Sequence, residues 1–167
     1  EGETSSDWKS VRGTWDFGDD IISARGSIGF NKAYKGERNL DDLTYEVTFR
    51  KTSNNDGPIG LMIRYDEKDD AGYLLLVWPH GGYQFSALLG EERRRITSED
   101  PSSVINQGKE WNTVALKAVG PEITITINDR EVASFTDDTF SSGKVGLVIH
   151  GDPEQSAEFK NPLLMER

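Results

Sequence analysis

The stretch IGLMIRYDEKDDAGYLLLVWPHGGYQFSALL, residues 59–89, decides the fold of this chain. Three apolar runs lie in it, at 59–65, 73–79 and 83–89. An acidic, glycine-ended segment separates the first two runs, and Pro79-His80-Gly81-Gly82 interrupts the chain before the third. Apolar runs of this length between turn residues predict three antiparallel strands joined by tight connections.

A symmetric fold of the two connections predicts the register of these strands. The first connection would pair Tyr65 with Tyr73, and the second would pair Trp78 with Tyr83. Because side chains alternate along a strand, one face then carries Met62, Arg64, Leu74, Leu76, Trp78, Tyr83 and Phe85, and the other carries Leu61, Ile63, Tyr65, Tyr73, Leu75, Val77, Gln84, Ser86 and Leu88. Both faces are mostly apolar, which predicts central strands with one face in the core and the other partly covered or lining a groove. A slip of one residue would exchange the two faces.

The rest of the chain shows strand patterns separated by turn residues. Residues 43–50 alternate, so that Leu43, Tyr45, Val47 and Phe49 are predicted to point into the core. Residues 123–127 and 131–135 are predicted to form a hairpin around Asn128-Asp129. About twelve short strands, no helix longer than a turn and frequent turn signals predict a β-sandwich or barrel.

Two segments carry weaker patterns. Residues 25–36 contain three glycines and are interpreted as a loop with a short strand near 28–30. Residues 1–7 are polar and are expected to form a frayed terminus of one domain that spans 1–167. The sequence begins at Glu1 without a signal peptide, so we interpret it as a mature or excised segment.

Composition narrows the partners of the chain. Its 167 residues include 29 acidic and 19 basic side chains, a formal net charge of −10. This charge argues against nucleic acids and anionic membranes, which need a basic surface, and it is compatible with neutral sugars or cations. The absence of cysteine excludes disulfides, zinc-thiolate sites and thiol catalysis. No run of 18 apolar residues is present, so no membrane insertion is expected.

The order of several segments resembles a known superfamily. The segments are Trp15, LTYEVTFR (43–50), GLMIRY (60–65), AGYLLLV (71–77), GGYQF (81–85), EWNTVALKAVGPEITITINDREV (110–132), FSSGKVGLVIHGD (140–152) and AEFKNPLLME (157–166). Together they resemble the concanavalin A-like jelly rolls of the laminin-G-like and 3-keto-disaccharide hydrolase superfamily. The resemblance implies an all-β, two-sheet antiparallel β-sandwich of the jelly-roll type. Such domains act as glycan-binding modules or accompany bacterial enzymes that handle polysaccharides, which implies an extracellular, periplasmic or cell-surface location.

One predicted strand face combines aromatic rings with an arginine. Arg64, Trp78, Tyr83 and Phe85 share that face, and His80 lies in the turn beside it. Aromatic rings stack on the apolar faces of sugars, and arginine hydrogen-bonds their hydroxyl edges. We therefore predict that these residues bind a polysaccharide or oligosaccharide, unless the three rings belong to the core and Arg64 only lies at its edge. Glu46, on the polar face of a neighbouring strand, would extend the groove or belong to an ordinary solvated face.

Catalytic signatures are weak in this sequence. Glycosidases need two carboxylates at a defined separation, and the chain lacks the E-x-D-x-x-E strand motif of jelly-roll glucanases. The leading hypothesis is a non-catalytic, lectin-like carbohydrate-binding module without catalytic residues. The alternative is an enzyme resembling keto-sugar hydrolases that uses His80 or His150 with Arg64 and Glu46. A laminin-G-like protein-interaction domain is a third possibility.

The acidic turn Asp66-Glu67-Lys68-Asp69-Asp70 is a candidate metal site. Calcium takes six to eight oxygen ligands, and the turn offers four carboxylates without the EF-hand spacing. Resembling folds sometimes hold a structural calcium, which we keep as a hypothesis beside an ordinary charged turn. No phosphate-binding or dinucleotide motif is present, so no organic cofactor is expected.

Overall fold

A computed structural model describes residues 7–97, 100–151 and 153–167, without the side chains of residues 37 and 100. The predicted frayed terminus thus lies outside the described residues, except for Asp7. In the described part of the chain the strands are β1 (Trp8–Ser10), β2 (Thr14–Phe17), β3 (Ile22–Arg25), β4 (Gly29–Leu40), β5 (Leu43–Lys51), β6 (Ile59–Asp66), β7 (Ala71–Val77), β8 (Gly82–Leu89), β9 (Glu92–Arg95), β10 (Asp100–Pro101), β11 (Asn112–Val119), β12 (Glu122–Ile127), β13 (Arg130–Thr136), β14 (Gly143–Gly151) and β15 (Ser156–Glu166).

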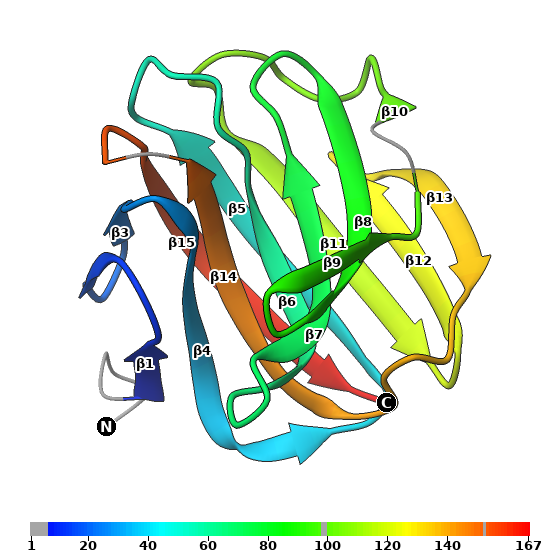
Figure 1. The fold of residues 1–167 in the computed structure, drawn as a ribbon. Coiled ribbons are helices and arrows are strands. Elements are labelled where there is room, and N and C mark those ends of the chain that lie inside the picture. Colours follow the sequence, from blue (N-terminus) through cyan, green and yellow to red (C-terminus); the bar gives the residue numbers. More distant parts are fainter. Residues whose placement is uncertain (1–6, 98–99, 152) are drawn as a thin grey trace.

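These strands form two antiparallel sheets packed as a sandwich (Figure 1). Sheet I has the strand order β1-β4-β14-β6-β7-β8-β10, and β9 pairs with β8 beside this path. Sheet II has the order β13-β12-β11-β5-β15-β3-β2. The predicted all-β, two-sheet jelly roll is therefore confirmed. No helix among the described residues is long and apolar enough to cross a membrane.

The main core lies between the two sheets. As predicted, the strand β5 buries Leu43, Tyr45, Val47 and Phe49, each at most 2% exposed, while its alternate residues are only half-buried. The predicted hairpin is also confirmed, because Asn128 and Asp129 join β12 to β13 with φ angles of 51° and 69°. Two positive φ angles are what a tight type I′ hairpin requires.

The prediction of a loop at 25–36 is wrong for its second half. The strand β4 runs from Gly29 to Leu40 and pairs with β1 on one side and β14 on the other. The strand was not predicted because its sequence is polar. Its polar side chains Asn31 and Lys32 are buried together with their bonding partners. Asn31 bonds Ser27 and the carbonyl of Ile149, and Lys32 forms an ion pair with Asp70.

The predicted register between β6 and β7 is wrong because of a β-bulge. The strands pair Ile63 with Tyr73 and then Asp66 with Ala71, so an extra residue lies in β6. Arg64 takes a φ of 52° at the bulge. Tyr65 therefore lies on the outer face of sheet I, among buried apolar side chains. The guanidinium of Arg64 points toward the connections at that end of the sandwich, where it donates a hydrogen bond to the Gly120 carbonyl.

The predicted register between β7 and β8 is wrong by one residue. Val77 pairs with Tyr83, because Trp78 still hydrogen-bonds Gly82 and only Pro79, His80 and Gly81 form the loop between them. Gly81 adopts a φ of 107° there. The slip moves Tyr83 and Phe85 to the inner face, where they are 4% and 0% exposed in the main core. Gln84 and Ser86, predicted on the face opposite to Leu74 and Leu76, pair with these leucines on the outer face instead.

A polar cluster holds the turns at the Arg64 end of the sandwich. Tyr73 donates a hydrogen bond from its hydroxyl to Asp137 Oδ1 (2.6 Å) and accepts one from Phe140 N (3.2 Å). Burial and the hydrogen bond with Asp137 raise the pKa of Tyr73 to about 12. Burial alone would raise the pKa of Asp137, but hydrogen bonds from Tyr73, Thr139 and Arg94 outweigh it and lower that pKa to about 2.

We expect Asp137→Asn to remove an acid-dependent part of the stability. The carboxyl pKa is about 2 in the folded protein against the ordinary value of 3.8, so the folded state gains stability above pH 4 that is lost as the pH falls toward 2. The shift corresponds to about 2 kcal/mol. Urea unfolding at pH 7 and at pH 2 checks this: the gap between wild type and variant should close at pH 2. A gap of equal size at both values would contradict the role given to the carboxylate.

Candidate functional site

The outer face of sheet I, which points away from sheet II, carries a second buried apolar cluster. It consists of Met62, Tyr65, Leu74, Leu76, Leu88 and Val148, with Phe30, Tyr34 and Trp78 partly buried against it. Each of the six is at most 1% exposed although it faces away from the main core. Other side chains therefore cover this face of the sheet.

Curvature explains how this face is covered. Five strand spacings separate β4 from β9, which in a flat sheet is about 24 Å. Yet the Arg93 guanidinium of β9 lies 5.6 Å from the ring centroid of Phe30 in β4. The sheet and its β8–β9 hairpin must therefore curl toward each other, and Figure 1 shows β9 crossing in front of the middle strands. We call this recessed surface the concave face.

Aromatic side chains mark the end of the concave face where β7 meets β8. Phe30 packs against His150 of β14 with 4.3 Å between ring centroids. Trp78, two strands away at the end of β7, is half-buried and stacks on His80 at 6.3 Å with 26° between the ring planes. Burial and the charge of Arg93 lower the pKa of His150, so its imidazole is neutral at pH 7 and can both donate and accept a hydrogen bond.

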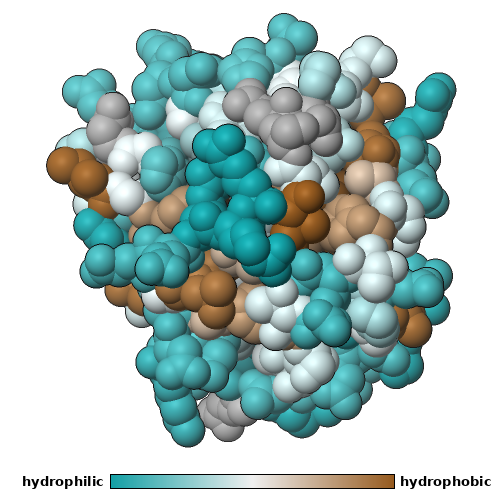
Figure 2. Space-filling view, turned by 45° about the vertical axis from the view of Figure 1, so that its right-hand side comes forward, coloured by the Kyte–Doolittle hydropathy of each residue, from teal (hydrophilic) through white to brown (hydrophobic). Residues whose placement is uncertain are grey.

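Polar groups lie among these apolar side chains. The buried ammonium of Lys32 pairs with Asp70 (3.0 Å), and Asp70 also accepts a hydrogen bond from the Tyr65 hydroxyl (2.6 Å). Figure 2 shows strongly hydrophilic residues gathered near the middle of one face of the molecule, beside a few apolar ones. Alternating polar and apolar groups suit a ligand that has both C–H faces and hydroxyl groups.

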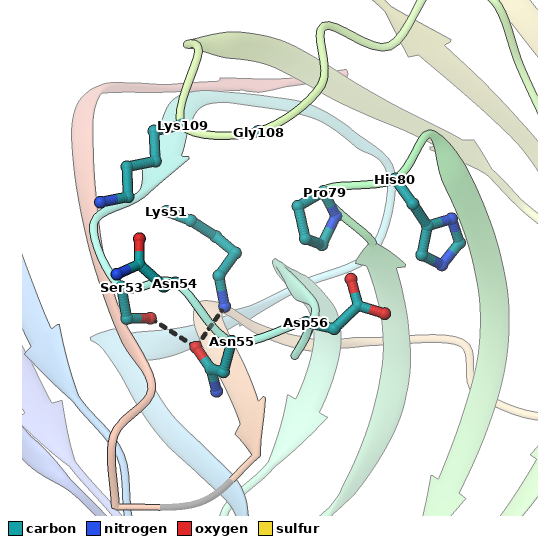
Figure 3. A pocket seen from close by; sticks show the side chains of 9 residues that line it. All are labelled: Lys51, Ser53, Asn54, Asn55, Asp56, Pro79, His80, Gly108 and Lys109. Carbon is teal, nitrogen blue, oxygen red and sulfur yellow. Dashed lines mark hydrogen bonds between the residues drawn. The ribbon is translucent and has the colours of Figure 1, made fainter.

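A hollow adjoins the Trp78–His80 pair at the loop end of the sandwich (Figure 3). Its volume is about 310 Å³, and it is lined by Lys51, Ser53, Asn54, Asn55, Asp56, Pro79, His80, Gly108 and Lys109. This volume lies at the small end of the range of ligand pockets. We call it the end hollow.

The floor of the end hollow is held in place by Lys51. Lys51 is 3% exposed. Its ammonium donates to Asn55 Oδ1 (2.9 Å), to the Gly57 carbonyl (3.1 Å) and to Gln155 Oε1. Ser53 donates to the same Asn55 oxygen at 2.6 Å. The amides of Asn54 and Asn55 and the carboxylate of Asp56 can hydrogen-bond hydroxyl groups of a ligand, and the rings of Pro79 and His80 beside them can pack against its apolar face.

The structure brings together only part of the predicted site. Trp78 and His80 lie next to each other between the concave face and the end hollow. Tyr83 and Phe85 are buried in the main core, and Arg64 is 1% exposed at the opposite end of β6. Glu46 lies on the outer face of sheet II, where it pairs with Ala115 of β11.

Sequence reasoning missed Phe30, Arg93 and the loops of the end hollow. Phe30 was missed because only a short strand near 28–30 was predicted in a segment otherwise interpreted as a loop. Arg93 belongs to a charged run, and the loop at 51–58 consists of residues that are typical of turns. That loop contains amides, a hydroxyl and an acid. This mixture is the signal in the sequence that could have indicated a polar pocket near Trp78.

The predicted metal and enzyme sites can be compared with the geometry. Two carboxylates of the acidic turn are ion-paired, Asp70 with Lys32 and Glu67 with Lys144 (3.1 Å). Among the described residues, no group of three or more His, Asp or Glu side chains is arranged to hold a metal ion. Calcium binding stays a prediction. The four residues of the enzyme hypothesis are not brought together, because Arg64 and Glu46 lie far from the two histidines.

Comparison with known proteins places this geometry in context. Residues 1–164 match the model of a family described as the 3-keto-alpha-glucoside-1,2-lyase-like domain. Among solved structures, the carbohydrate-binding module CBM66 from Bacillus subtilis is similar with a TM-score of 0.81 and 27% identity, over 96% of each chain. No curated protein sequence matches the chain.

More distant structures share the fold. A putative glycosyl hydrolase from Parabacteroides distasonis has a TM-score of 0.67 and 15% identity, covering 99% of this chain and 90% of its own. The exoplasmic/lumenal domain of VIP36, solved with Ca²⁺ and Man3GlcNAc bound, has a TM-score of 0.70 and 10% identity, covering 99% of this chain and 87% of its own. At these identities the similarity shows the fold alone.

Proposed function

Because the chain belongs to the family of 3-keto-alpha-glucoside-1,2-lyase-like domains, we propose that it binds carbohydrate and does so as a non-catalytic, lectin-like module. The observation that carries the proposal is the Trp78–His80 pair, which lies between the concave face and the polar end hollow. A ring that packs on one side and fixed hydrogen-bonding groups on the other match the two surfaces of a sugar.

The similarity to a carbohydrate-binding module supports this proposal. The chain matches CBM66 over 96% of both chains with 27% identity, so the similarity covers the whole domain and both proposed binding surfaces. A module of this kind would act outside the cytoplasm, in keeping with the exoplasmic/lumenal domain of VIP36, which shares the fold. We extend the proposal to a secreted or cell-surface protein of bacterial type with a polysaccharide or oligosaccharide ligand.

A binding role accounts better for the described side chains than catalysis does. An acid–base pair must lie within reach of one reacting bond, and the hypothesised partners of His80 and His150 are elsewhere. Glu46 is on the other sheet and Arg64 is buried among backbone carbonyls. The end hollow supplies one carboxylate, Asp56, which is enough to hold a hydroxyl group but not to act as a pair.

A retention screen tests the proposed function. The purified protein is passed over immobilised polysaccharides and oligosaccharides, once with calcium and once with a chelator, and both retention and released products are measured. We expect retention without product release. Product release would support the enzyme hypothesis instead. If the protein showed neither retention nor product release, a protein-interaction domain would be favoured. Loss of retention with the chelator would support the calcium prediction, and equal retention would contradict it for ligand binding.

A further inference from the structure

Arg93 is a half-buried cation on the concave face with a fixed orientation. Its Nη1 donates to Gln84 Oε1 at 2.5 Å and lies 3.5 Å from Ser86 Oγ. Both acceptors are uncharged and at most 2% exposed. The guanidinium also packs over the ring of Phe30. Three contacts from β4 and β8 therefore hold one end of the guanidinium in place.

Among the residues that the structure describes, the other end of this guanidinium has no protein partner. Within the described residues, Nε and Nη2 of Arg93 donate to no acceptor and no carboxylate pairs with the side chain. Burial and the neighbouring charge of Arg95 lower the pKa of Arg93. The surroundings thus disfavour the charge that the side chain carries, and an anion at its unpartnered edge would reverse this.

The Nε–Nη2 edge of arginine presents two parallel N–H groups that match the two oxygens of a carboxylate. We propose that Arg93 binds the carboxylate of a uronic acid, so that the ligand of the concave face is an acidic oligosaccharide. This inference rests on the proposed carbohydrate-binding function and restricts its ligands to acidic oligosaccharides. The rings of Phe30 and Trp78 border the same face and can pack against sugar residues.

The net charge of −10 does not prevent an acidic ligand. At physiological ionic strength, exposed charges farther apart than about 8 Å are largely screened. A hydrogen-bonded contact to a half-buried guanidinium is screened much less, and its neighbours on this face include Arg95 and Lys32. Asp70, the carboxylate beside Lys32, is already neutralised by its ion pair. The local field around Arg93 is therefore positive within an acidic protein.

Ligands that differ only in the charge of the carboxyl group measure how much the carboxylate contributes to the affinity. Oligogalacturonates and their methyl esters share one backbone and differ in charge, so calorimetric titration of the whole protein with both measures what the carboxylate contributes. We expect the acid form to bind about 10- to 100-fold more tightly than the ester, the range for a charge-assisted bidentate contact. We also expect the affinity for the acid form to fall with added salt.

Variants assign the difference to Arg93. Arg93→Met should abolish the preference for the acid form, and Arg93→Lys, which keeps the charge but lacks the planar edge, should retain only part of it. Arg25→Met is the control: this side chain is exposed on β3 of sheet II, and its removal should change the affinity less than about 2-fold. Thermal unfolding of each variant verifies that the fold persists.

The imidazole of His150 provides a readout that is independent of affinity. An anion at Arg93 offsets the charge that lowers the pKa of His150, so NMR titration should show this pKa rising with galacturonate and not with its methyl ester. Equal binding of acid and ester, or binding of the acid that Arg93→Met leaves unchanged, would overturn the inference while the carbohydrate-binding function stands. Absence of binding to every acidic and neutral glycan would overturn both.

Discussion

Replacing Arg64 by methionine is expected to lower the free energy of unfolding by about 3–5 kcal/mol, the range for breaking a buried charge interaction. The side chain is 1% exposed. Its guanidinium donates to three backbone carbonyls, Asp41 O (2.7 Å and 3.1 Å), Gly120 O (2.8 Å) and Phe140 O (3.1 Å). Its substitution leaves these carbonyls without their donor.

The effect should be large because these carbonyls come from three different connections. They belong to the turns after β4 and β11 and to the segment before β14, so Arg64 joins both sheets at one end of the sandwich. Asp42 is 3.5 Å from the same guanidinium and also accepts a hydrogen bond from Gly120 N. Loss of the arginine therefore loosens several turns together rather than one contact.

Urea unfolding of Arg64→Met, with Arg38→Met as the control, measures this effect. Arg38 forms an ion pair with Glu166 whose side chains are 71% and 49% exposed, and such surface pairs contribute about 0–1 kcal/mol. Arg64→Lys should be nearly as unstable as the methionine variant, since an ammonium cannot reach all three carbonyls in their plane. A loss below 1 kcal/mol for Arg64→Met would show that water replaces the guanidinium, contrary to its assigned role.

Arg64 also shows where prediction from sequence ends. Alternation of apolar and polar residues identified β5 and the β12–β13 hairpin, and continuous apolar runs identified β6 and β7. Register depends on turns and bulges, and one residue decides which face a side chain takes. The bulge at Arg64 and the three-residue loop before Gly82 each shift the pattern by one position. Neither shift leaves a mark in the apolar pattern, because both faces of these strands are apolar.

The candidate site was predictable only where its members are close in sequence. Trp78 and His80 lie in one turn, so the break after β7 indicated them together. Phe30 and His150 lie side by side because β4 pairs with β14, and the curvature of sheet I brings Arg93 of β9 over Phe30. Curvature depends on the packing of both sheets, which local patterns do not contain.

The second large effect concerns ligand binding. We expect Trp78→Ala to weaken glycan binding at least about 30-fold, the loss typical of an aromatic residue at the centre of a binding site. The indole is half-buried and contacts both the concave face and His80, so a sugar that packs on it also reaches the polar groups of the end hollow. Affinity electrophoresis in gels that contain the retained polysaccharide measures the change.

Trp111→Ala is the matched control for this experiment, because it makes the same change elsewhere on the surface. Trp111 precedes β11 of sheet II and is packed under Arg50 (4.8 Å) and Lys160 (4.0 Å), so its ring is occupied by protein cations. Trp78→Phe should keep much of the affinity, since a smaller ring can still pack on a sugar. If Trp111→Ala weakened binding and Trp78→Ala did not, the ligand would bind the outer face of sheet II. The concave face would then serve to cover the hydrophobic side of sheet I.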